Sequence, residues 1–359
     1  MSTHSVFHPL TVESIEPLTD DSVAITFTVP DDLREEYRFT QGQHVNVRTE
    51  LAGDDVRRSY SICSPVSSGR LRIAVKRLPG GAFSEHALET LKAGDVLDVM
   101  TPSGRFFTEL DPTHERHYAC IAAGSGITPI LSIVASTLEA EPRSSVTLLY
   151  ANRTHRSVMF LEEVEDLKDR YPDRLQLVHV LSREPQEVEL FSGRLDEDRL
   201  TRILDTIVPV ETVDEWFLCG PYPMVQSLRK VLVHAGVTKR SIHAEVFHVD
   251  SSPVRRTPVA TPTATGDGAE VTITLDGRRS TFQLAADGPP VLDAAVTVRA
   301  DVPFACKGGV CGTCRAKVVE GEVVMDSNYA LEPDEVDAGY VLTCQSHPTT
   351  DKVVLDYDA

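Results

Sequence analysis

The sequence has no long hydrophobic run. None of its 359 residues lie in a stretch approaching the roughly 18 uninterrupted apolar residues that a membrane-spanning helix needs. The N-terminus, MSTHSVFHPLTVESIEPLTDD, also lacks the basic-then-apolar pattern of a secretory signal. We therefore expect a cytoplasmic protein without a membrane partner. The sequence shows no internal repeat either.

Positive charge is scarce. The chain has 35 Lys and Arg against 54 Asp and Glu, a formal net charge of −19. Such a chain repels phosphate backbones, and its basic residues form no large cluster, so we expect no nucleic-acid partner. A charged protein partner would be basic.

Cysteines are few, and their number is odd. In a reducing compartment seven cysteines are not expected to form a disulfide framework, so a metal or redox role is favoured. Three of them, Cys306, Cys311 and Cys314, lie in ACKGGVCGTC, and Cys344 follows in LTCQSHP. The spacing C-x4-C-x2-C with a distant fourth cysteine is that of plant-type [2Fe–2S] sites, where glycines let the backbone approach the cluster. A zinc site is the alternative.

The length predicts two or three domains. Residues 1–112 show short apolar alternations between regular turn signals, which favour an antiparallel β-barrel or sandwich. In residues 113–248, apolar runs alternate with helical patterns, which predicts an α/β domain with a parallel sheet. Residues 249–269, rich in Pro and Thr, predict a linker to a small domain at 270–359.

Two stretches of the first domain suggest a flavin site. RRSYSICS resembles the flavin signature of the ferredoxin–NADP reductase family through Arg58, Tyr60 and Ser61. A guanidinium fork suits a pyrophosphate, an aromatic face stacks on the flavin ring and a hydroxyl can reach it. In KRLPGGAFSEHALETL, Gly80, Gly81 and Ser84 introduce a helix expected over 84–91, whose N-terminal amides can bind phosphate. An ordinary strand and an ordinary capped turn are the alternatives.

Two further motifs suggest a nicotinamide nucleotide. The loop after an apolar strand, in AAGSGITPI, resembles the nucleotide loop of the same family, and FLCGPYP resembles its C-G-P motif. The residues concerned are Gly124, Ser125, Gly126, Thr128 and Pro129 in the loop, and Cys219, Gly220 and Pro221 in the second motif. A buried strand-end thiol is the alternative for the cysteine.

The stretch HVLSREP bears on the choice of nucleotide. Ser182 and Arg183 suit the 2′-phosphate of NADPH, whereas the neighbouring Glu184 would suit the 2′-hydroxyl of NADH. Arg153 is a second candidate phosphate contact. We predict NADPH.

The order of these motifs resembles that of ferredoxin–NADP reductase relatives with a C-terminal plant-type ferredoxin domain. The resemblance implies an FAD barrel, an NADP domain and an α+β, β-grasp-like ferredoxin domain. It also implies reaction roles for Ser61, Cys219 and Glu245, although the chain continues past Glu245 into the linker, unlike the plant enzymes.

Such a chain would pass electrons from NADPH to FAD, to the cluster and to a partner oxygenase. Over the whole chain the sequence resembles reductases of CoA-ester epoxidases, and reductases of steroid or aromatic-ring hydroxylases, which it also resembles, are the alternative. A zinc-stapled, redox-sensing or structural subunit without catalysis is a third possibility. Residues 270–359 hold 15 acidic against 7 basic residues, so we expect the oxygenase to dock near this acidic domain.

Overall fold

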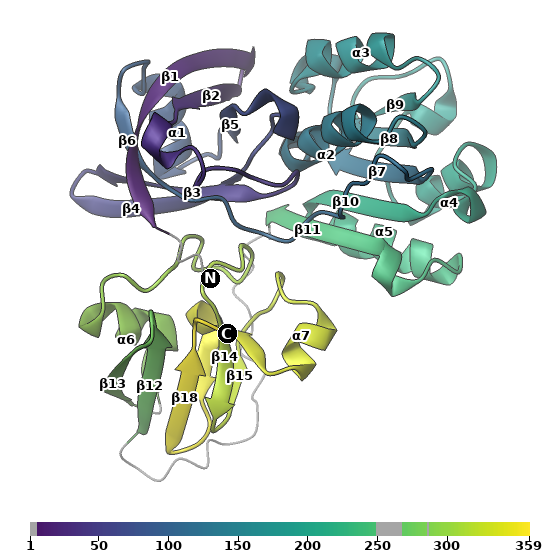
Figure 1. The fold of residues 1–359 in the computed structure, drawn as a ribbon. Helices are drawn as coiled ribbons and strands as arrows, with labels where there is room; N and C mark the ends of the chain where they lie inside the picture. The colour runs from purple at the N-terminus through teal and green to yellow at the C-terminus, as the bar shows by residue number, and fades with distance from the viewer. Residues whose placement is uncertain (1–5, 249–267, 286) are drawn as a thin grey trace. The chain divides into compact units, whose positions relative to one another are not determined.

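The computed structural model describes residues 6–248, 268–285 and 287–359. These residues divide into two compact units, which we describe separately. The larger unit contains two sheets and the smaller unit contains the C-terminal domain (Figure 1). The predicted linker lies outside the described residues, except that Gly268 is described and Ala269 begins a strand. No helix of the described part is long and apolar enough to cross a membrane.

The first sheet of the larger unit has six strands in the order β4-β3-β6-β1-β2-β5. An isolated bridge between Ile62 and Ile73 brings the chain after β4 to β5, so the sheet curls toward closure. Its core is a cluster of alternating apolar side chains that includes Leu10, Ile25 and Val99. The elements are β1 (Phe7–Thr19), β2 (Ser22–Thr28), β3 (His44–Leu51), β4 (Asp54–Ser61), β5 (Leu71–Lys76), α1 (Ala82–Glu89) and β6 (Val96–Met100).

The second sheet is parallel, with five strands in the order β11-β10-β7-β8-β9. Helices α2 and α3 cover one face, and α4 and α5 cover the other (Figure 1). Ligands of such sheets bind at the carboxyl ends of the strands. The elements are β7 (His117–Ala123), α2 (Ile127–Ala140), β8 (Ser145–Asn152), α3 (Leu161–Arg170), β9 (Leu175–Leu181), α4 (Glu197–Thr206), β10 (Glu215–Pro221), α5 (Tyr222–His234) and β11 (Ile242–His248).

The smaller unit is a mixed five-stranded sheet, in the order β13-β12-β18-β14-β16, with a separate pair β15-β17. Apolar residues of α6, among them Val291 and Leu292, pack on the core of this sheet in a β-grasp-like arrangement. The elements are β12 (Ala269–Leu275), β13 (Arg278–Leu284), α6 (Val291–Val298), β14 (Arg315–Glu320), β15 (Val323–Met325), α7 (Pro333–Asp337), β16 (Tyr340–Leu342), β17 (Ser346–Pro348) and β18 (Lys352–Asp356).

Candidate functional site

The two predicted flavin motifs meet in the barrel. Arg58, Tyr60 and Ser61 lie in β4, and the Tyr60 ring packs against Phe83 of α1 with ring centroids 5.4 Å apart. Phe83 is fully buried and therefore anchors α1 on the barrel. The aromatic residue of the first motif thus lies beside the helix that the second motif introduces.

A tight turn precedes α1, which begins at Ala82, two residues before the predicted helix. A Cβ atom at Gly81 would lie 2.6 Å from Ser84 Oγ and 2.9 Å from the Leu78 carbonyl oxygen, so only glycine fits. Ser84 Oγ accepts a hydrogen bond from the Leu78 amide at 3.0 Å, and the Glu85 carboxylate accepts one from the Gly80 amide at 2.8 Å. This turn fixes the start of a helix whose amides suit a phosphate.

The nucleotide loop contacts the C-G-P motif. Gly124–Gly126 form a single turn of 3-10 helix between β7 and α2. A Cβ atom at Gly126 would lie only 2.3 Å from the Cys219 carbonyl oxygen and 3.0 Å from the Gly220 amide nitrogen. Glycine is therefore required there, because the loop lies directly on the Cys219–Gly220 peptide near the end of β10.

The other residues of these two motifs lie in the same region, around the start of α2 and the end of β10. Thr128 Oγ1 donates to the Ser125 carbonyl oxygen at 3.0 Å, Pro129 lies in the first turn of α2, and Pro221 is the last residue of β10. Both motifs therefore lie at the carboxyl edge of the parallel sheet, where dinucleotides bind.

Three residues with predicted reaction roles come together in the larger unit. Ser61 Oγ donates a hydrogen bond to Glu245 Oε1 at 3.1 Å, although the two residues are 184 positions apart. Glu245 is the parallel partner of Cys219 in the β10–β11 ladder. Burial, followed by the nearby Glu245 charge, raises the pKa of the Cys219 thiol well above its usual value. Cys219 is therefore a neutral thiol.

The predicted 2′-phosphate residues lie side by side after β8 and β9. The Arg183 amide donates to the Arg153 carbonyl oxygen at 2.8 Å, and both side chains are exposed. Ser182 is held in the same way by Asn152. The Glu184 carboxylate accepts a hydrogen bond from the His155 amide at 2.8 Å, so part of its accepting capacity is used within the protein.

The four cysteines of the smaller unit fall into two pairs. Cys306 shares a hydrogen bond with Cys311, and Cys314 shares one with Cys344. In each pair this bond lowers the pKa of one sulfur, that of Cys311 or Cys344, and raises the pKa of its partner, so one sulfur of each pair is favoured as a thiolate. Within the described residues, no three His, Cys, Asp or Glu side chains form a single metal-ion site. A two-iron cluster in which each iron takes one pair fits this arrangement.

Amide groups of the glycine-rich loop point at these sulfurs. The Gly308 amide lies 3.3 Å from Cys306 Sγ, and the amides of Val310 and Gly309 donate to Cys306 and Cys344 respectively. Donors of this kind stabilise a cluster with anionic sulfurs and tune its potential. The donor set therefore fits a [2Fe–2S] cluster.

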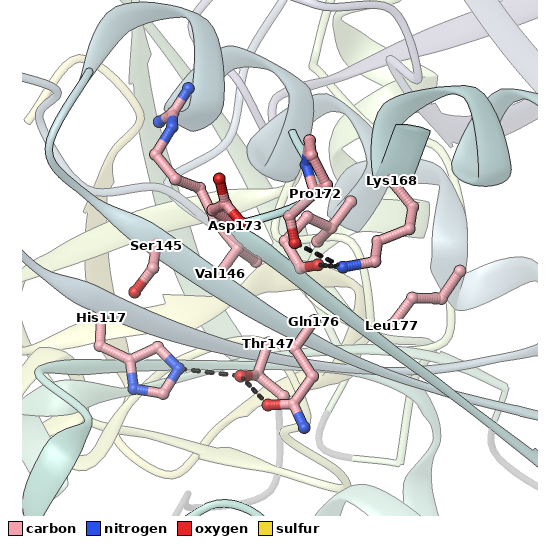
Figure 2. A pocket seen from close by; sticks show the side chains of 11 residues that line it. His117, Ser145, Val146, Thr147, Lys168, Pro172, Asp173, Gln176 and Leu177 are labelled. Carbon is pink, nitrogen blue, oxygen red and sulfur yellow. Dashed lines mark hydrogen bonds between the residues drawn. The ribbon is translucent and has the colours of Figure 1, made fainter. Parts of the chain in front are cut away.

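A pocket of about 350 Å³ lies at the opposite edge of the parallel sheet (Figure 2). Its lining includes His117, Ser145 and Leu175, which are the first residues of β7, β8 and β9. His117 and Thr147 are hydrogen-bonded at 2.9 Å, and Lys168 donates to two carbonyl oxygens. The pocket is thus remote from the nucleotide loop and its polar groups bond one another, so we assign it no cofactor.

Comparison with known proteins agrees with this division into sites. Residues 9–108 match the family described as oxidoreductase FAD-binding domain, 120–230 the oxidoreductase NAD-binding domain, and 273–349 the 2Fe-2S iron-sulfur cluster binding domain. Over 355 residues the chain is 44% identical to one of the subunits of 1,2-phenylacetyl-CoA epoxidase from Escherichia coli (strain K12), covering 99% of each chain. The chain belongs to the family of three-domain oxygenase reductases.

Another relative of this oxygenase reductase serves a different oxygenase. The ferredoxin reductase component of 3-ketosteroid-9-alpha-monooxygenase from Rhodococcus rhodochrous is 33% identical, with 97% of this chain and 96% of the relative covered. Among solved structures, phthalate dioxygenase reductase shares the fold with a TM-score of 0.58, 24% identity and 98% of both chains covered.

These matches confirm the predicted fold class. The oxygenase reductase is an oxidoreductase with FAD-binding, NAD-binding and [2Fe–2S] domains, so the zinc-stapled, non-catalytic alternative is wrong. The individual residue roles and the preference for NADPH stay predictions.

The contacts between the barrel and α2 are not among those predicted from the sequence. Ser132 Oγ donates to the Ser64 carbonyl oxygen at 2.7 Å, Ser136 Oγ accepts from the Val66 amide at 3.0 Å, and Glu139 accepts from Ser67. The signal was available, because positions 132, 136 and 139 lie about one helical turn apart in a mainly apolar helix.

Proposed function

We propose that this oxygenase reductase passes electrons from NADPH to the oxygenase component of a phenylacetyl-CoA epoxidase, in aerobic phenylacetate degradation. The end-to-end 44% identity to the E. coli protein carries this proposal. When bound, FAD takes up two electrons as hydride and the cluster passes them on singly. We also propose a cytoplasmic location, since none of the seven cysteines, all of which lie in the described residues, forms a disulfide.

A steroid hydroxylase is the alternative partner, supported by the 33% identity to the Rhodococcus reductase. The deciding experiment mixes the purified chain and NADPH with each oxygenase in turn and measures product. We expect epoxide from phenylacetyl-CoA and little steroid hydroxylation. Turnover with the steroid oxygenase alone would overturn the proposed partner.

We infer that β4 and the turn before α1 hold FAD. The Arg58 guanidinium would pair with the pyrophosphate, and the Tyr60 ring would stack on the flavin. Gly80, Gly81 and Ser84 would place the first amides of α1 at the phosphates. The packing of Tyr60 on Phe83 supports a single site for these two motifs.

The Ser61–Glu245 hydrogen bond suggests how the reacting groups are oriented. Glu245 accepts the hydroxyl hydrogen of Ser61 and so fixes the direction of that hydroxyl beside the flavin strand. Cys219, a neutral thiol in contact with the nucleotide loop, would pack beside the nicotinamide rather than act as a nucleophile. These residues therefore orient the two rings for hydride transfer.

The nucleotide loop and C-G-P motif would bind the rest of NADPH. Arg183 and Arg153 lie together at the carboxyl edge of the sheet, where they can share the 2′-phosphate. The hydrogen bond from the His155 amide occupies part of the Glu184 carboxylate, which is then less available to bind the 2′-hydroxyl of NADH. This arrangement supports NADPH over NADH.

We propose that the oxygenase docks on the acidic surface of the ferredoxin domain near α7. Asp334 and Asp337 on α7 are exposed. Glu332 and Glu335 instead form the capping box of that helix, and Glu335 also pairs with Arg315 at 3.3 Å. The two aspartates are therefore the candidates for attracting a basic partner surface.

A further inference from the structure

Arg72, in β5 of the barrel, joins the barrel to the nucleotide domain of the larger unit. Its side chain is only 12% exposed. One terminal nitrogen lies 2.9 Å from each carboxylate oxygen of Glu163, and the other lies 2.9 Å from Glu16 Oε2. Glu163 is in the first turn of α3 and Glu16 is in β1, so one guanidinium ties a helix of one domain to a strand of the other.

The main chain of Arg72 contacts the end of the flavin strand. Its carbonyl oxygen accepts hydrogen bonds from the Cys63 amide at 2.9 Å and from Cys63 Sγ at 3.2 Å. Burial raises the pKa of the Cys63 thiol to about 12, so the sulfur keeps its proton and continues to donate. Cys63 follows Ser61 by two residues, and Arg72 therefore fixes the segment that carries the Ser61 hydroxyl.

The side chain of Arg72 is connected to the nucleotide loop through α3. Its guanidinium carbon lies 5.2 Å from the ring centroid of Phe160, the residue before α3, which has the left-handed φ of 56°. The buried Tyr150 hydroxyl lies 3.2 Å from the Met159 carbonyl oxygen and 3.1 Å from that of Gly124. One hydroxyl, whose single hydrogen the two carbonyl oxygens share, thus links the start of α3 to the first glycine of the loop.

We propose that Arg72 is a positioning residue for hydride transfer. It holds the Gly124–Gly126 loop in register with the Ser61–Cys63 segment, so that a nicotinamide on the loop meets the flavin on the strand. Displacement of reacting atoms by about 1 Å can slow a reaction about a hundredfold, even when the change is distant from the chemistry. The inference rests on the proposed placement of the nicotinamide at this loop.

The test compares FAD-loaded, full-length variants by rapid mixing with NADPH. In Arg72→Gln we expect the rate of flavin reduction at saturating NADPH to fall about ten- to a hundredfold. We expect the KM for NADPH to change by less than about threefold. A larger deuterium isotope effect should accompany the slower hydride step. Arg72→Lys should lose part of the rate, because a single ammonium group cannot reproduce the contacts that the two terminal guanidinium nitrogens make with Glu163 and Glu16.

Two further variants separate positioning from charge. Arg48 pairs with Asp98 at 2.8 Å inside the barrel alone, so Arg48→Gln removes an ion pair without touching the nucleotide domain and should keep the wild-type rate. Glu163→Gln should slow reduction as Arg72→Gln does, and the double variant should lose little more than either single change, because both act through one contact.

Several results would overturn the inference. One such result is a wild-type rate of reduction for the flavin that stays bound in Arg72→Gln, even if this variant binds FAD more weakly or unfolds more easily. Another is a rate loss in the double variant that equals the two single losses combined. If Arg72→Gln cannot be purified, a wild-type rate in both Arg72→Lys and Glu163→Gln would also overturn it. Failure of the proposed function looks different, since the wild-type flavin itself would then not be reduced by NADPH.

Discussion

Glu141 is a buried carboxylate that ties the segment after the barrel to the nucleotide domain. It accepts hydrogen bonds from Tyr118 at 2.9 Å, Ser144 at 2.7 Å, His114 at 2.8 Å and the Asp111 amide at 3.1 Å. Burial alone would raise the pKa of Glu141, but these hydrogen bonds, led by that of Ser144, lower it overall. The ionised form is therefore the one that stabilises the fold.

Replacing this carboxylate should reduce stability in a pH-dependent way. An amide cannot accept from all four donors, so Glu141→Gln should lower the free energy of unfolding by about 1–3 kcal/mol at pH 7. Because the folded pKa is depressed, the carboxylate's contribution is present above about pH 4.3 and is lost as the pH falls through the folded value. The difference in free energy of unfolding between wild type and variant should therefore shrink at acidic pH.

The single tryptophan, Trp216, is fully buried in β10 and reports this unfolding by fluorescence. Denaturant titrations of both proteins between pH 3 and pH 8 make the comparison. A gap that stays constant across this range would show that the ionised carboxylate is not the stabilising form.

Arg183 should determine the choice between the two nicotinamide nucleotides. Arg183→Ala should raise the KM for NADPH about ten- to a hundredfold and leave that for NADH nearly unchanged, because a lost charged hydrogen bond costs about 1.5–3 kcal/mol. Steady-state kinetics with both nucleotides measure this. Arg170, exposed on α3, offers a matched control in Arg170→Ala. Equal losses with both nucleotides would contradict a 2′-phosphate contact.

At the scale of elements, the ferredoxin domain has a core of its own, in which Cys314 and Cys344 are members. Cys311→Ser should therefore remove or destabilise the cluster while FAD stays bound. NADPH should still bleach the flavin, and transfer to the oxygenase should stop. Iron content, visible spectra and partner reduction test this, with Cys120→Ala, a buried change in β7, as the control. Normal iron content in Cys311→Ser would reject the ligand assignment.

Most elements could be predicted from local patterns, because short apolar alternations and helical periodicity depend on neighbouring residues. Helix α4 has the same kind of signal, because Leu200, Ile203 and Leu204 recur at helical spacing among charged residues. The motifs indicated each cofactor, but contacts such as Ser61 with Glu245 or Arg72 with Glu163 join distant segments. Such pairs depend on how the sheets pack, which no local pattern contains.

For the whole molecule, the acidic ferredoxin domain predicts salt-sensitive electron delivery. Transfer to the oxygenase should slow with added NaCl, because steering between charged surfaces is screened within about 8–10 Å near physiological ionic strength. Reduction of the flavin by NADPH should change less. Rapid-mixing measurements of both steps across a salt series test this.

Charge reversal provides the second arm of that test. Asp334→Lys with Asp337→Lys should slow the transfer at low salt without altering the cluster spectrum. Reversal of Glu332 and Glu335 is unsuitable, because it would break the α7 capping box. If oxygenase turnover changes neither with added NaCl nor in the variant with both aspartates reversed, the acidic surface has no docking role.

The serine contacts of α2 predict an unequal tolerance of mutation on the two sides of that interface. In two of these contacts the helix contributes the side chains of Ser132 and Ser136, and the barrel contributes the main chain of Ser64 and Val66. In a saturation library selected for flavin reduction, positions 132 and 136 should accept few substitutions. Position 66 should accept almost any residue except proline, which lacks the amide hydrogen. Positions 64 and 66 of the barrel can thus diverge in sequence, whereas positions 132 and 136 of the helix that contacts them cannot.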